Sequence, residues 1–172
     1  MKAIFTIFLP LILITLLTIA GCDTGKPVPT KRLEKVLPDR FGDYVLVNTV
    51  RNAGGPVLSE VTGHYKNTAG SVSEGIGVDG EIRIVVQDYG ATKKSTQLPV
   101  AEGSDNFDYK GIKCYRGLQP GSGIYELRIP IGGRVLLRIE FDDIESINET
   151  RILDAINWDA LKGIATEWEG LG

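Results

Sequence analysis

The chain has 172 residues and a net charge of −3, and its composition is ordinary for a globular protein. This length accommodates one domain once an N-terminal leader is removed, and a domain of that size buries enough surface to fold without a disulfide framework. The mild acidic balance lacks the clustered basic excess that accompanies nucleic-acid binding, so we expect no nucleic-acid partner.

The N-terminus begins with a charged residue, Lys2, and continues with an uncharged run over residues 3–20 that is rich in Ile, Leu and Phe. A run of this length lies between the apolar core of a signal peptide and a membrane-spanning helix. Pro10 weakens it as a span, and the run ends in the tetrapeptide IAGC, residues 19–22. An aliphatic residue, two small residues and a cysteine in that order resemble the lipobox of bacterial lipoproteins.

This resemblance covers the first 22 residues only. It implies that residues 1–21 are a signal peptide, that cleavage falls between Gly21 and Cys22, and that Cys22 is the lipidation site. In that family the cysteine thiol carries a diacylglyceryl group and the new amine is usually acylated, with palmitate as a typical acyl chain. Two or more acyl chains hold a protein stably at a bilayer. The alternatives are an uncleaved membrane anchor and an ordinary signal peptide that is cut elsewhere.

The resemblance also implies a place in the cell. We expect a cell-envelope protein at a bacterial cell membrane, facing the periplasm or the outside. Asp23 after the cysteine resembles the inner-membrane retention signal of some Gram-negative groups. In a Gram-positive host the protein would face outward from its single membrane.

Residues 22–36 are polar and contain Pro27 and Pro29, which is typical of an extended linker. We expect this segment to be a flexible, lipid-anchored tether that reaches roughly 40 Å, followed by a single globular domain over residues 37–172. The four basic residues of the tether either favour an anionic membrane surface or belong to a solvated linker; they are Lys26, Lys31, Arg32 and Lys35.

Alternating apolar residues and turn signals predict several strands in the domain. These lie over residues 44–50, 57–66, 81–88, 109–118 and the hairpin 125–141, in which Gly132 and Gly133 form the turn. The stretch 89–108 shows no clean period and is expected to be a long loop.

The C-terminus changes to helical spacing after a cap at Ser146 or Asn148, and Asn157 can divide it into two helices. The predicted fold class is therefore α+β. It is a mostly antiparallel sheet of five to six strands, with a C-terminal helix or two short helices packed on one face.

No motif for catalysis or for a cofactor is evident, and we expect neither an enzyme nor a metal site. His64 is the single histidine, and the sequence contains no Gly-x-Ser-x-Gly elbow. After Cys22 the only other cysteine is Cys114, so zinc ligands are too few. We expect Cys114 to be a small buried residue without a disulfide partner.

Four aromatic residues flank the long loop and form the candidate ligand or partner surface: Tyr89, Phe107, Tyr109 and Tyr115. Such side chains offer a large contact area and hydroxyl groups, although ordinary core packing is the alternative. The outer face of the hairpin carries three arginines that could meet an acidic partner, with Glu126 and Glu140 expected to interrupt them; they are Arg128, Arg134 and Arg138.

Three functions follow from these observations. The first is a non-catalytic protein-interaction or assembly module that contacts another envelope protein. The second is a lipoprotein that binds or senses a small ligand and uses the loop 89–108. The third, an envelope hydrolase, would require His64 to meet an acid and a nucleophile in one cleft.

Overall fold

The computed structural model describes residues 26–54, 57–68, 80–90, 105–119, 121–141 and 148–166. The predicted signal peptide, its cleavage site at Gly21 and the lipidation site Cys22 lie outside these residues, as does Ser146. Most of the expected loop, residues 91–104, lies outside them as well. Within the described ranges, no helix is long and apolar enough to cross a membrane.

A single sheet forms the centre of the domain, and every neighbouring pair of its strands is antiparallel. The fold is α+β, as predicted. The eight strands of the described ranges follow the order β1-β2-β3-β4-β8-β7-β6-β5. Strands β1 to β4 form one meander and β5 to β8 a second, and the pairing of β4 with β8 joins the two. Their bounds are β1 Arg40–Phe41, β2 Tyr44–Gly54, β3 Val57–Asn67, β4 Glu81–Asp88, β5 Asp105–Tyr109, β6 Ile112–Leu118, β7 Tyr125–Ile131 and β8 Val135–Phe141.

The prediction of five to six strands is wrong for two local reasons. Strand β1 has only two residues, which is too short for any alternation to show. Strand β5 occupies the end of the stretch predicted to be irregular, and a tight turn at Lys110 and Gly111, both with positive φ, separates it from β6.

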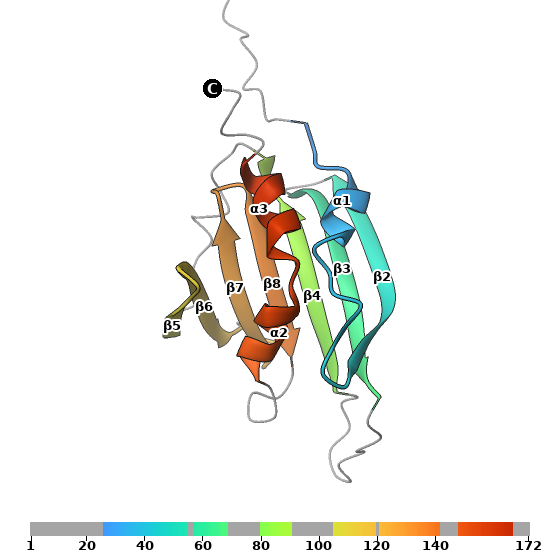
Figure 1. Ribbon diagram of the computed structural model, residues 1–172, viewed down its shortest axis with the longest axis vertical. Coiled ribbons are helices and arrows are strands. Elements are labelled where there is room, and N and C mark those ends of the chain that lie inside the picture. The colour runs from blue at the N-terminus through green and yellow to red at the C-terminus, as the bar shows by residue number, and fades with distance from the viewer. Residues whose placement is uncertain are drawn as a thin grey trace, which may run out of the picture.

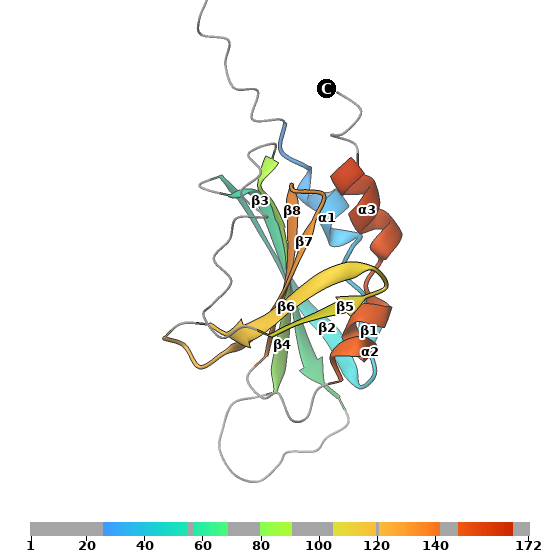
Figure 2. The same ribbon diagram turned by 90° about the vertical axis from the view of Figure 1, so that its left-hand side faces the viewer.

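Among the described residues, three short helices cover one face of the sheet: α1 Thr30–Glu34, α2 Glu149–Ala155 and α3 Trp158–Thr166. Figures 1 and 2 show all three on the same side, with β5 and β6 crossing the other strands steeply. The side chain of Asn148 accepts a hydrogen bond from the Arg151 amide, and that of Asn157 accepts one from the Ala160 amide. Two capped C-terminal helices are therefore confirmed.

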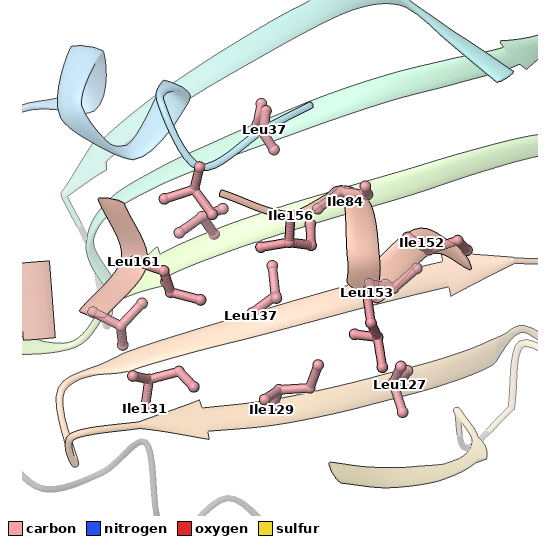
Figure 3. Close-up of a cluster of buried hydrophobic side chains, with 14 of the residues drawn as sticks. Leu37, Ile84, Leu127, Ile129, Ile131, Leu137, Ile152, Leu153, Ile156 and Leu161 are labelled. Atoms are coloured by element: carbon pink, nitrogen blue, oxygen red, sulfur yellow. The ribbon is translucent and has the colours of Figure 1, made fainter. Parts of the chain in front are cut away.

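The core lies between these helices and the sheet (Figure 3). Alternate residues of the central strands point toward the helices and are almost fully buried, which is the expected behaviour of a sheet with one covered face. The buried side chains include Ile84, Leu127, Ile129 and Leu137 from the strands, Leu153 and Leu161 from the helices, and Ile156 from the link between α2 and α3.

The expectation of a flexible tether over residues 22–36 is wrong for its second half. Residues 30–34 form α1, and Val28, Leu33 and Val36 belong to the hydrophobic core. Leu33 and Val36 are fully buried. These apolar side chains are held on the helix-covered side of the sheet, so the domain includes residues well before the predicted start at residue 37.

A buried polar cluster fixes this N-terminal segment. Asp88 lies at the end of β4, and its two carboxylate oxygens accept hydrogen bonds from Nε and Nη2 of Arg134 at 2.7 and 3.0 Å. The same carboxylate accepts a hydrogen bond from the amide of Val28, while Arg134 donates to the carbonyl of Lys26. Ser59 donates to the carbonyl of Val28. Residues 26–28 are therefore tied to β3, to β4 and to the turn that precedes β8.

Candidate interaction surfaces

The structure divides the four predicted aromatic residues between the two faces of the sheet. Phe107 and Tyr109 face the helices. The hydroxyl of Tyr109 donates to Asp154 of α2 at 2.5 Å, and its ring lies 5.6 Å from the ring of Trp158. These two residues take part in packing between β5 and the helices.

Tyr115 and Tyr89 lie away from the helices. Tyr115 is paired across β6 and β7 with Arg128. The hydroxyl of Tyr89 donates to the side chain of Gln87 at 3.2 Å, and burial raises the pKa of this phenol. The four residues therefore do not form one surface. Residue parity along β5 and β6 places Phe107 and Tyr109 on the side of buried Cys114, and Tyr115 on the opposite side.

The face of the sheet opposite the helices carries a square of charged side chains on β7 and β8. The register places Arg128 opposite Arg138 and Glu126 opposite Glu140. Glu126 contacts Arg128 at 2.6 Å and Arg138 at 3.4 Å, and Arg138 contacts Glu140 at 2.9 Å. Arg83 of β4 extends the square by an ion pair with Glu140 at 3.1 Å.

The two arginines and two glutamates of the square largely cancel one another's charge. The Glu126 side chain is only 2% exposed and that of Glu140 only 8%, and a buried carboxylate is tolerated where cations surround it. The two glutamates do interleave the arginines, as the sequence suggested. Arg134 is not part of the row, because it is buried with Asp88.

The surroundings of His64 and Cys114 favour structural roles for both residues. Nδ1 of His64 lies 2.5 Å from Oε1 of Glu81 on the neighbouring strand. Within the described residues, His64 forms no hydrogen bond with a serine, threonine or cysteine. Cys114 is free and buried, and burial raises the pKa of its thiol to about 11, which disfavours the reactive thiolate. Over the same parts of the chain, no group of three or more His, Cys, Asp or Glu residues could hold a metal ion.

The outer edge of β2 is a feature that the sequence did not indicate. Strand β1 pairs only with Tyr44 and Val45, and the amide of Leu46 donates to the carbonyl of Asp39. Beyond Leu46, no described strand adjoins this edge of β2, which runs on to Gly54. The edge position results from the tertiary order of the strands, so no local pattern could reveal it.

The direction of each backbone amide on β2 follows from the pairing. The amide of Leu46 points away from β3, so Leu46 and its partner Tyr65 form a pair without hydrogen bonds between them. The backbone N–H and C=O groups of Tyr65, and of every second residue of β3 before it, therefore point toward β4. The partners of these β3 residues are Thr49, Arg51 and Ala53. The backbone groups of these three residues therefore point to the unpaired side.

The edge is weakly protected against a further strand. Natural sheets cover an open edge or place lysine, proline or a bulge on it. From Val47 to Gly54 the sequence contains neither lysine nor proline, and the one positive charge, Arg51, is paired with Glu34 of α1. Two register shifts, one at Val47 and one between Ala53 and Gly54, are the protecting irregularities. Val47 and Val50 are 52% and 39% exposed on this edge.

Comparison with known proteins finds no protein-family model, curated protein or solved structure that matches the chain.

Proposed function

We propose that this chain is a lipid-anchored protein of the bacterial cell envelope, and that its domain is a non-catalytic protein-interaction module. The partner would be another envelope protein, which adds an extended strand to the outer edge of β2. The anchoring half of the proposal rests on the N-terminal sequence, in which Cys22 ends a lipobox-like leader.

The unpaired backbone of β2 is the observation that carries the interaction half. Proteins that recognise extended segments use such an edge, where main-chain hydrogen bonds supply affinity and alternate side chains supply specificity. The outward backbone groups of Thr49, Arg51 and Ala53 offer a ladder of donors and acceptors. Exposed Val50 gives an apolar contact for one side chain of the added strand.

A photo-crosslinking amino acid at Val50 tests the interaction in cells, with the same probe at exposed Lys113 of β6 as the matched control. We expect the Val50 probe to capture one envelope protein reproducibly and the Lys113 probe to capture none. Capture of the same protein from both positions would contradict binding at the β2 edge.

Two variants then test the role of the backbone. Thr49→Pro removes an outward amide, and proline is tolerated in a strand where the amide faces solvent; Thr49→Val keeps the amide. We expect capture to be lost in Thr49→Pro and kept in Thr49→Val, with both variants folded by circular dichroism.

Amide hydrogen exchange with the purified partner gives a measurement that does not depend on substitution. Binding should slow exchange at Thr49, Arg51 and Ala53 and leave Asn48, Val50 and Asn52 nearly unchanged, because the latter already bond to β3. Equal protection at all six amides, or full capture by Thr49→Pro, would overturn strand addition.

The lipid anchor is tested separately by membrane fractionation. The native protein should remain in the membrane pellet after a high-salt wash, whereas Cys22→Ala behind a leader that an ordinary signal peptidase removes should not. A Cys22→Ala protein that pellets equally well after its leader has been cut would show that a lipid on this residue is not the anchor.

A further inference from the structure

We infer that the domain stands directly on the membrane, with one defined end against the anionic lipid surface and its strands pointing away from the bilayer. This inference rests on the proposed lipidation of Cys22. It goes beyond anchoring, because it names the surface that meets the lipid and the orientation of the β2 edge.

The argument begins with the length of chain between the lipid and the first fixed residue. Lys26 is held by the hydrogen bond from Arg134 to its carbonyl, at 2.8 Å, and Val28 is buried. Lys26 is only four positions after Cys22 in the sequence. Four residues span at most about 14 Å even when fully extended. The domain therefore cannot be raised 40 Å above the headgroups, as a tether to residue 36 would allow.

The place where Lys26 enters the domain identifies the end that faces the lipid. Asp88 and Arg134 lie where β4 ends and β8 begins, and Ser59, paired with both Ala53 and Asp88, holds Val28. Figures 1 and 2 show the N-terminal segment entering at the same end as the β7–β8 turn and the end of α3. We call this the anchor end. Lys66 and Glu81 lie at the opposite ends of their strands.

The charge of the first ordered residues suits an anionic surface. Residues 26–36 contain four basic residues and one acidic residue, a difference of +3, in a chain whose net charge is −3. The single acid, Glu34, is already paired with Arg51. Lys26, Lys31 and Lys35 are exposed, and lysines held next to a bilayer are attracted to anionic headgroups.

This orientation has a consequence for the proposed partner. Strand β2 runs toward the anchor end, from Tyr44 to Gly54. The open edge of β2 therefore begins near the membrane at Gly54 and extends away from it to Val47. A partner strand would lie roughly perpendicular to the bilayer, within about 40 Å of it, since β2 has 11 residues.

Energy transfer from a donor dye to headgroup-labelled lipid measures the orientation in the full lipidated protein. The vesicles contain phosphatidylethanolamine and anionic phosphatidylglycerol. The donor is attached at Ala53→Cys, near the anchor end, or at Lys66→Cys, at the far end of the same hairpin; both positions are exposed. The two sites are about 23 Å apart along β3, since Ser59 pairs with Ala53. Cys114 is buried and is not labelled.

We expect severalfold more transfer from position 53 than from position 66. Inserting twelve Gly and Ser residues after Gly25 should remove most of this difference, because a flexible chain of that length allows the domain to turn over. Equal transfer from both positions in the uninterrupted protein, or more transfer from position 66, would overturn the orientation.

A charge reversal separates the lysine contribution from the length restriction. Lys31→Glu combined with Lys35→Glu should lower transfer from position 53 in anionic vesicles and leave it unchanged in neutral vesicles, whereas Lys113→Glu should change neither. An equal effect in neutral vesicles would contradict a role for anionic headgroups. Failure of the anchor itself is recognised independently, as a mature protein whose Cys22 lacks the mass of the lipid.

Discussion

Asp88 and Arg134 form a two-point ion pair that is nearly excluded from solvent, although 46 residues separate them in the sequence. The pair joins the end of β4 to the start of β8 and also binds the N-terminal segment. Burial alone would raise the pKa of Asp88, but Arg134 and the amides of Val28 and Gly90 outweigh it, and the pKa lies below its ordinary value.

Removal of one partner should therefore destabilise the domain strongly. We expect Asp88→Ala to lower the free energy of unfolding by about 3–5 kcal/mol, because it leaves the buried guanidinium of Arg134 without its counter-charge. Denaturant unfolding of a chain that begins at Asp23, and so lacks both the leader and Cys22, measures this. Lys110→Ala, which removes an exposed ion pair with Asp154, should leave the midpoint nearly unchanged. Similar losses in the two variants would contradict this account of the cluster.

The same carboxylate makes stability depend on pH in a defined direction. A carboxyl whose pKa is lowered by folding contributes stability that is fully present above its unfolded pKa, about 3.9, and that is lost as the pH falls through the folded value. Asp88→Asn lacks this contribution. The difference in unfolding free energy between the wild type and Asp88→Asn should therefore be largest near neutral pH and should shrink below about pH 4. A constant difference between pH 7 and pH 3 would contradict the lowered pKa.

Leu33→Ala tests whether residues 28–36 belong to the domain. Leu33 is fully buried on α1, so we expect a loss of about 2–5 kcal/mol in unfolding free energy. Lys31→Ala on the same helix is exposed and should change stability by less than about 0.5 kcal/mol. A negligible effect of Leu33→Ala in thermal or denaturant unfolding would indicate that residues 28–36 are a linker and not part of the domain.

The two glycines of the β7–β8 turn allow a matched comparison. Both have positive φ, +56° at Gly132 and +68° at Gly133, so alanine is strained at either position. A Cβ on Gly132 would also lie 2.9 Å from the Cβ of Ala165 on α3, whereas a Cβ on Gly133 has no neighbour within 4 Å. Gly132→Ala should therefore lower the melting temperature more than Gly133→Ala. Equal decreases in melting temperature would mean that α3 can move away from the new Cβ without a loss of stability.

The parts of the fold that depend on local pattern were predictable from the sequence. The alternation in β3, β4, β7 and β8, the turn at Gly132 and Gly133 and the cap at Asn148 all appear in the structure. Pro130 lies beyond Arg128, where the pairing of β7 with β6 ends, so its missing amide costs no hydrogen bond on that side.

The remaining features depend on contacts between distant residues. Val28, Leu33 and Val36 are separated by prolines and charges, which hid their common burial. The spacing of Leu33, Val36 and Leu37 was a weak signal of one apolar helix face. The pairing of Asp88 with Arg134 and the open edge of β2 follow from strand order, which periodicity does not determine.

That strand order also determines when the sheet can be completed. The first four strands and the last four are each joined by neighbours in sequence, and only the pairing of β4 with β8 connects them. Closing so long a loop is entropically costly and slow. In a chain that emerges from a translocation channel N-terminus first, the edge of β4 opposite β3 stays unpaired until residues 135–141 have also emerged. In such a chain, the sheet formed by β1 to β4 would be the species most exposed to misassembly.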